Sequence, residues 1–269
     1  MSHKSISLLK NLSRTTSTRR TVTVINSNVT NSVHQVMDAM HAPVYFETYD
    51  IKGNMNHLPQ EVVRSIRKNK VCLNGRLETS LCGGARKELG LFAFMVNCFN
   101  LNGQRSRQKN VNIVVIRENT DAEYAWREHE IAKMYPIITY EYDEISVDSC
   151  CLQLVEKLER FDVIVTPSLY GNLIANIAAG PAGGNGDNIM PGGSFGGEYA
   201  VFEQVGCVRN NENPVALLFS SAMMLRYLQL PLSADRLETA LKRFISEGKC
   251  GNSNTTAQEV VDAVIANLD

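Results

Sequence analysis

Two arginines in the first half of the chain could hold an anionic ligand. Arg86 follows a glycine turn, and Arg117 stands at the end of an apolar run. Because each guanidinium can hold a carboxylate through two parallel hydrogen bonds, such a pair suits a polycarboxylate. The ordinary alternative is that the two are unrelated surface or ion-pairing residues. Tyr124, a few residues after Arg117, is a candidate general acid, although tyrosines at such places also serve packing alone.

Two asparagines, Asn172 and Asn176, stand where a metal site could form. They are four residues apart in a predicted helix and therefore share one of its faces. Carboxylates there would bind a divalent cation, because hard cations favour charged oxygen ligands. Carboxamides carry no charge, so a tight metal site is not expected at this pair.

The segment 161–203 is the most site-like stretch of the sequence. Its β-branched run Val163–Val165 predicts a buried strand, and the following helix carries apolar residues, among them Leu169 and Leu173, on one face. Glycines then crowd into 180–197, where bare backbone N–H groups could approach a ligand closely. Strand, helix and glycine-rich loop together predict a small-molecule site on an α/β scaffold.

Strand-like and helix-like segments alternate along the chain. Strands are expected near 21–25, 43–49, 71–73, 91–99 and 112–116, and helices near 28–40, 59–70, 148–158, 214–230, 233–247 and 255–268. Residues 74–89 have an irregular, glycine-containing pattern. The helix after Pro214 is apolar on every side, as is typical of a core or a subunit interface. This alternation predicts an α/β fold with a mostly parallel sheet.

Composition narrows the classes of partner. The chain has 269 residues, 44% of them hydrophobic, which is enough for a substantial core. Its net charge of −1 carries no signature of nucleic-acid binding, and no apolar run is long enough to insert into a membrane. The seven cysteines form no CxxC pair, and several stand in apolar runs, which fits a reducing compartment.

The first twenty residues differ from the rest of the chain. They hold five lysines and arginines, many hydroxyl side chains and no acid. This composition, with a short leucine-containing apolar face, predicts a transit peptide over residues 1–20 and a place in the mitochondrial matrix. A disordered basic tail is the alternative. Residues 21–269 are expected to form the folded domain.

Several segments resemble the isocitrate and isopropylmalate dehydrogenase family. They are Ala85–Leu89, Arg117–Thr120 with Glu123-Tyr124, Phe161–Ala179, Gly196–Glu203 and Asn213–Leu225. The likeness runs from about residue 21 to the C-terminus and implies the family's α/β fold. Within the family, the chain is most similar to the non-catalytic, gamma-type subunits of mitochondrial NAD-dependent isocitrate dehydrogenase. The reason is that Asn172 and Asn176 stand where catalytic subunits have aspartates for Mg²⁺ or Mn²⁺.

The resemblance implies roles for individual residues. Arg86 and Arg117 match two of the three arginines that grip the carboxylates of isocitrate, and Val96 stands where the third belongs. Tyr124 matches the tyrosine that works in proton transfer in the family.

Two further residues match positions that contact cofactors in the family. Asp148 matches an acidic residue that reaches across the dimer to the metal ion of the partner, and Asn213 matches an asparagine of the nucleotide site. The family's cofactors are NAD and Mg²⁺ or Mn²⁺, and the departures described next count against both in this chain.

The chain departs from the family pattern at several places. After about residue 130 it lacks much of the clasp region, a stretch that also holds the catalytic lysine of the family. Residues 26–30 replace the glycine turn after the first strand, and the loop for the NAD adenosine is shortened to 204–212. Losing a general acid–base costs about 10²–10⁴-fold in rate, and losing the metal removes on the order of several kcal/mol of transition-state stabilisation. Tyr124 would then be vestigial.

These features favour a gamma-like subunit of a mitochondrial NAD-dependent isocitrate dehydrogenase of the tricarboxylic acid cycle. Such a subunit would be regulatory or inactive by itself, would bind a catalytic subunit, and could bind citrate, isocitrate or ADP. Two alternatives stay open from the residues alone. One is a weakly active NAD-dependent 2-hydroxy-acid oxidoreductase, and the other is a stand-alone pseudoenzyme that binds a nucleotide or citrate.

Overall fold

The computed structural model describes nine stretches of the chain. They are residues 19–25, 27–51, 58–75, 83–100, 111–119, 143–182, 190–205, 213–247 and 255–268. The described residues do not include residues 1–18 of the predicted transit peptide, Tyr124, or the shortened clasp region after residue 130.

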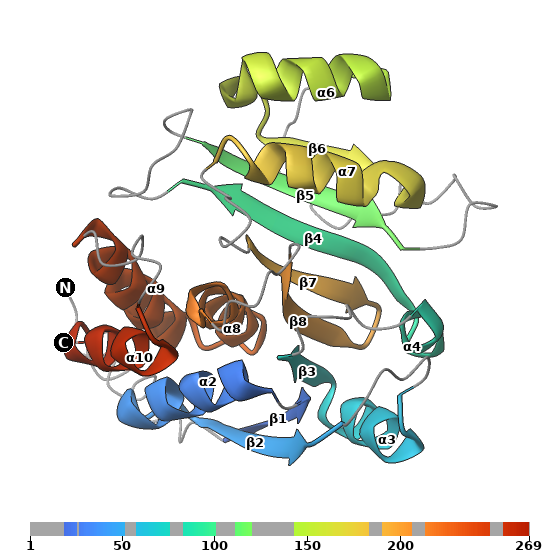
Figure 1. Cartoon of the computed structure of the whole chain (residues 1–269). Helices are drawn as coiled ribbons and strands as arrows, with labels where there is room; N and C mark the ends of the chain where they lie inside the picture. The colour runs from blue at the N-terminus through green and yellow to red at the C-terminus, as the bar shows by residue number, and fades with distance from the viewer. Residues whose placement is uncertain are drawn as a thin grey trace, which may run out of the picture.

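The described strands form one eight-stranded sheet through the centre of the fold (Figure 1). Its strands are β1 (Arg20–Ile25), β2 (Val44–Tyr49), β3 (Val71–Asn74), β4 (Leu91–Phe99), β5 (Asn112–Glu118), β6 (Val163–Thr166), β7 (Met190–Gly196) and β8 (Ala200–Val205). Their order is β2-β1-β3-β8-β7-β4-β5-β6. Four of the seven neighbouring pairs are parallel, whereas β8, β7, β4 and β5 pair antiparallel in the middle. The predicted α/β fold with a mostly parallel sheet is confirmed, with a mixed centre.

Helices pack on both faces of this sheet (Figure 1). They are α2 (Asn28–Ala39), α3 (Gln60–Asn69), α4 (Gly83–Glu88), α6 (Val147–Glu156), α7 (Ser168–Ala179), α8 (Val215–Tyr227), α9 (Pro231–Ser246) and α10 (Ala257–Ala266). A capping box starts α10, where the Glu259 N–H donates to the Thr256 hydroxyl over 3.3 Å and the Glu259 carboxylate accepts from the Thr256 N–H over 2.8 Å. None of the described helices is long and apolar enough to cross a membrane.

Two large apolar clusters fix where the helices lie. The first packs α2, α8, α9 and α10 against β1, β3 and β8, and it buries Leu217 and Leu218 of α8 completely. The second packs α6 and α7 against β4 and β5 and includes Phe94. On β4, Phe99 instead meets Phe219 of α8 edge to face, with ring centroids 5.2 Å apart. Helices α7 and α8 therefore lie on opposite faces of β4. The pattern of α8 predicted a core or a subunit interface, and the helix lies in the core.

The glycine-rich segment is partly a strand. Residues 190–196 form β7, while 183–189 lie outside the described residues. A Cβ on Gly192 would stand only 2.7 Å from the Met95 carbonyl oxygen, so glycine lets β7 and β4 approach closely. The Gly192 N–H faces the Ser220 hydroxyl of α8 at 3.3 Å. For these residues the prediction of a ligand-facing loop is wrong, because their small size serves packing between strands and helix.

Two further predictions need correction. The run Val163–Val165 forms β6 as expected, but it is the last strand of the described sheet, and Val163 and Val165 are 56% and 46% exposed. It is therefore buried on one face only, where Ile164 joins the cluster of α6 and α7. Residues 83–88, within the segment expected to be irregular, form the short helix α4, which carries Arg86.

Candidate functional site

Arg86 and Arg117 come together at the ring of Phe94. The guanidinium carbon of Arg117 lies 4.9 Å from the ring centroid, and that of Arg86 lies 5.6 Å from it. Phe94 of β4 pairs directly with Arg117 of β5, and α4 brings Arg86 to the same ring. A guanidinium within about 6 Å of an aromatic face gains cation–π attraction. Val96, two residues further along β4, is buried in the apolar cluster of α6 and α7 and supplies no third charge.

A buried carboxylate stands beside Arg86. Glu203 of β8 is 1% exposed, and its Oε1 lies 3.8 Å from Nη2 of Arg86. Its Oε2 accepts a hydrogen bond of 2.8 Å from Asn74, its register partner in β3. Within the described residues, Nε and Nη2 of Arg86 are buried and donate no hydrogen bond. Arg86 therefore keeps directed donors that a ligand oxygen could fill.

Two asparagines hold Arg117. Its Nη1 donates to Oδ1 of Asn172 over 2.5 Å, and its Nε and Nη2 donate to Oδ1 of Asn119 over 3.2 and 3.0 Å. Gly171 gives the side chain its room, because a Cβ there would stand 2.1 Å from Cγ and Cδ of Arg117. Asn172 is thus a positioning contact between the first turn of α7 and the end of β5.

The charged side chains of this cluster leave it positive. Arg86 and Arg117 carry two positive charges against the single carboxylate of Glu203. Burial and, to a smaller extent, the neighbouring charge of Arg86 lower the pKa of Arg117 to about 10, with Glu203 opposing the shift. Arg117 is still protonated at neutral pH. An excess positive charge in a largely buried place favours an anionic ligand.

The donor set at α7 does not fit a divalent metal ion. Oδ1 of Asn172 already accepts from Arg117, so a cation bound there would stand beside a positive guanidinium. Asn176, one turn further on, offers an exposed neutral amide. Across the described parts of the chain, no group of three His, Cys, Asp or Glu side chains is placed to hold a metal. The residues of α7 therefore support no metal-assisted step.

Two other predicted site residues stand at helix starts. Asp148 is exposed in the first turn of α6, where hydrogen bonds from the Ser146 side chain and from the Ser149 and Asp148 backbone lower the pKa of its carboxyl. Asn213 precedes α8, and its Oδ1 accepts the Val215 N–H over 3.0 Å. That carboxamide oxygen therefore supports the start of the helix.

Sequence reasoning missed three residues that build the arginine site, namely Phe94, Asn119 and Glu203. Phe94 meets Arg117 through strand register, which no local pattern reveals. Asn119 lies inside a segment that was singled out, but its contact depends on the turn after β5. Glu203 did carry a signal, because a carboxylate directly after the apolar run 200–202 is unusual in a buried strand and needs a partner.

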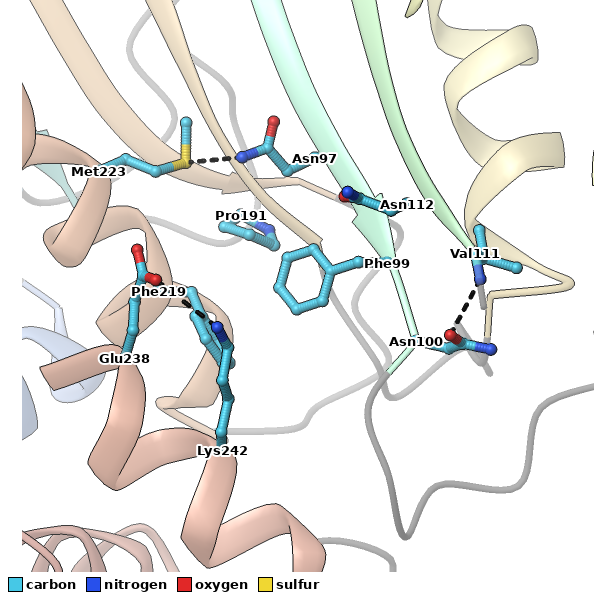
Figure 2. A pocket seen from close by; sticks show the side chains of 10 residues that line it. All are labelled: Asn97, Phe99, Asn100, Val111, Asn112, Pro191, Phe219, Met223, Glu238 and Lys242. Carbon is cyan, nitrogen blue, oxygen red and sulfur yellow. Dashed lines mark hydrogen bonds and ion pairs between the residues drawn. The ribbon is translucent and has the colours of Figure 1, made fainter. Parts of the chain in front are cut away.

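A pocket of about 340 Å³ lies elsewhere, between the β4–β5 pair and helices α8 and α9 (Figure 2). The Asn97 amide of β4 points to the Met223 sulfur of α8 over 3.7 Å, and Lys242 of α9 pairs with Glu238 over 3.7 Å (Figure 2). None of the residues predicted from the sequence as site residues lines it. This hollow is therefore separate from the arginine cluster.

The β6 end of the sheet exposes large apolar side chains. They are Leu152 and Val155 in α6, Val163 and Val165 in β6, and Leu169 and Leu173 in α7. We call this set the apolar edge surface. Figure 1 shows α6, α7 and β6 together at one end of the molecule. Exposed apolar side chains gathered in one region are typical of a surface that another protein covers.

Comparison with known proteins gives matches along nearly the whole chain. Residues 125–264 match the isocitrate/isopropylmalate dehydrogenase family. An Arabidopsis thaliana protein named NAD isocitrate dehydrogenase subunit-like 4 is 54% identical over 311 positions, covering 93% of this chain and 99% of that protein. The mitochondrial regulatory subunit 1 of NAD isocitrate dehydrogenase from the same organism is 47% identical over 372 positions, covering 100% of both chains. Since this chain has 269 residues, many positions of the second alignment face internal gaps in it.

A solved structure shares the fold. Isocitrate dehydrogenase from Methylococcus capsulatus matches with a TM-score of 0.75 and 24% identity, covering 93% of this chain and 99% of that one. At this identity the likeness shows the fold alone, and the sequence relatives supply the closer relationship. From its fold, its matching segments and these relatives, the chain belongs to the isocitrate/isopropylmalate dehydrogenase family.

Proposed function

We propose that the chain is a gamma-like, regulatory and non-catalytic subunit of a mitochondrial NAD-dependent isocitrate dehydrogenase. The observation that carries the proposal is the bond from Arg117 to Asn172. It keeps a substrate-type arginine in place with a neutral carboxamide, at a position that could otherwise supply a carboxylate for a metal. The 47% identity to a protein named as a regulatory subunit supports the same function.

The ligand of the site is a tricarboxylate, citrate or isocitrate. Arg117, held at the Phe94 ring, would bind one carboxylate, and Arg86 has unfilled donors for a second. Binding is expected without a divalent metal, because the charge that attracts the ligand comes from the arginines. ADP is the second ligand to test, since its phosphates are also polyanionic.

The partner is a catalytic isocitrate dehydrogenase subunit, which covers the apolar edge surface. Asp148 supports this arrangement, because it stands exposed one turn before Leu152 on α6 and could reach into the partner's metal site. Curated relatives named as subunits support a hetero-oligomer. The enzyme as a whole would use NAD and Mg²⁺ or Mn²⁺, held by the partner, while Asn213 of this chain serves a helix start and Tyr124 is vestigial.

We further propose that residues 1–20 direct the chain to the mitochondrial matrix and that 21–269 form the mature domain, with a shortened clasp. The names of relatives as mitochondrial proteins support the first part. The N-terminus of the protein recovered from isolated mitochondria, read by mass spectrometry, tests it. A first residue near 21 is expected, and an intact Met1 would contradict the proposal.

Co-expression with a catalytic subunit tests the main proposal. We expect one complex on size-exclusion chromatography, no NADH production from isocitrate by this chain alone, and a change in the apparent KM of the complex when citrate is added. Failure to form a complex would contradict the subunit assignment. NADH production by the purified chain alone, abolished by Tyr124→Phe, would instead support the weakly active oxidoreductase.

A further inference from the structure

The two arginines of the site differ in their counter-charges. Arg117 donates to the neutral carboxamides of Asn172 and Asn119, and it forms no ion pair within 4.0 Å among the described residues. Arg86 instead faces the carboxylate of Glu203 at 3.8 Å. An incoming anion can therefore approach Arg117 without displacing an ion-pair partner, whereas the positive charge of Arg86 is already partly balanced by Glu203.

Its surroundings keep the carboxylate of Glu203 beside Arg86. Its side chain is 1% exposed, and Asn74 fixes one carboxylate oxygen from the neighbouring strand while the other faces Arg86. A buried carboxylate with a fixed hydrogen bond cannot turn away to solvent when a ligand arrives. Its 3.8 Å separation from Arg86 is too long for a hydrogen bond, so the ion pair leaves the Nη2 donor unfilled.

We propose that Glu203 is an internal counter-anion that competes with the ligand for Arg86 and so sets the affinity of the site for polycarboxylates. This inference rests on the proposed binding of citrate or isocitrate. A first ligand carboxylate binds Arg117, which has no carboxylate within 4.0 Å among the described residues. A second carboxylate reaches Arg86 only by sharing it with Glu203 and by standing close to a buried like charge, which weakens the binding.

The competition predicts a difference between ligands that bear one and several carboxylates. Glu203→Gln removes the competing charge and keeps an oxygen that can accept the Asn74 hydrogen bond. We expect its citrate affinity, measured by isothermal titration calorimetry in EDTA, to rise by about tenfold, as for one charged hydrogen bond. The affinity for acetate should stay within about twofold, because acetate needs Arg117 alone.

A matched control separates this local effect from net charge. Glu198→Gln makes the same substitution on an exposed carboxylate. Glu198 lies in the turn between β7 and β8 and pairs with Lys70 at the surface. It changes the total charge of the chain equally but does not touch Arg86. We expect the citrate affinity of this variant to equal that of the wild type.

Thermal unfolding gives a readout that a purely structural role would not produce. Without ligand, Glu203→Gln leaves Arg86 buried without its counter-ion, so its Tm should fall below the wild-type value. Citrate supplies the missing charge, and the rise in Tm at saturating citrate should be larger for the variant than for the wild type. If Glu203 only stabilised the fold, citrate would raise both Tm values equally.

A double variant keeps the test decisive if Glu203→Gln alone folds poorly. Arg86→Met with Glu203→Gln removes both buried charges at once and should fold. Its citrate affinity should not exceed that of the wild type, because without Arg86 there is nothing to compete for. Tighter citrate binding by the double variant than by the wild type would overturn the proposal.

The outcomes separate this inference from the function on which it rests. If neither the wild type nor Glu203→Gln binds citrate, the arginine site is not an anion site, and the proposed ligand is wrong together with this inference. If the wild type binds citrate and Glu203→Gln binds it equally or more weakly, Glu203 does not compete with the ligand. That result overturns the inference alone.

Discussion

Arg117 donates a hydrogen bond of 2.5 Å to the carboxamide oxygen of Asn172, across the junction between β5 and α7. The contact gives Asn172 a function of its own, because it orients the guanidinium without neutralising it. An aspartate at this position would make an ion pair with Arg117 and remove the excess positive charge on which anion binding depends.

Asn172→Asp should weaken citrate binding. The new carboxylate would pair with Arg117 at short distance and repel the ligand, so we expect citrate affinity in EDTA to fall by about tenfold. Asn176→Asp is the matched control, since Asn176 is an exposed neighbour on the same helix, and it should change the affinity by less than about twofold. Calorimetric titration of both variants checks this, and equal affinities for them would contradict the role of Asn172.

Gly171→Ala should disturb the arginine site directly. The added Cβ would stand 2.1 Å from Cγ and Cδ of Arg117, so the side chain must leave its place between the two asparagines. We expect a loss of about 1–3 kcal/mol in the free energy of unfolding, as for other overpacked positions, and loss of citrate binding. Gly197→Ala is the control, because nothing lies within 4 Å of its added Cβ. Urea unfolding that shows the same stability for both variants would contradict the prediction.

Leu169→Glu should break the complex with a catalytic subunit while leaving the fold intact. Leu169 is 78% exposed on the apolar edge surface, so a charge there costs the free chain little but would be buried at the interface. We expect affinity for the partner to fall by at least about tenfold and the free energy of unfolding to change by less than about 0.5 kcal/mol. Leu232→Glu, at a residue 84% exposed on α9, should bind as the wild type does. Co-elution of the Leu169 variant with the partner would show that this surface is not used.

His34 should make stability depend on pH. Its ring packs against Phe46 with centroids 4.5 Å apart, and burial lowers its pKa below 6.5, while Asp38 opposes the shift. Below pH 6.5 the unfolded chain therefore binds this proton more readily than the folded chain, and stability falls as pH decreases through the lowered pKa. Urea midpoints measured between pH 7.5 and pH 5 should show this decrease in the wild type and a smaller one in His34→Gln. Parallel pH profiles for the two proteins would contradict it.

The sequence was a good guide wherever burial and periodicity decide the structure. The all-round apolar pattern of α8 predicted a place in a core or a subunit interface, because this signal is local. The capping box of Thr256 and Glu259 is likewise set by residues that are neighbours in the sequence. The family resemblance rested on segments rather than on single residues, and the relatives confirm it. The side-by-side placement of Arg86 and Arg117 was only one of two alternatives, since their contact depends on how α4 lies against β4.

Features that depend on strand register or on a partner could not be read from the sequence. The run Val163–Val165 has the composition of a buried strand, yet the described chain covers only one face of it and leaves Val163 and Val165 exposed. An apolar side chain looks the same in sequence whether its own core or another protein covers it. In the same way, the glycine-rich sequence around Gly192 predicted a ligand-facing loop, although β4 packs into the space where a Cβ of residue 192 would stand.

The apolar edge surface has a consequence for the chain before assembly. β6 pairs with β5 on one side and is the last strand of the described sheet, with valines exposed beside it. A free strand edge with apolar neighbours invites mispairing with other chains, which cells limit by degrading proteins left without their partner. We therefore expect the steady-state amount of this protein to follow the supply of its partner, so that overproduction alone yields aggregation or rapid turnover rather than a larger soluble pool.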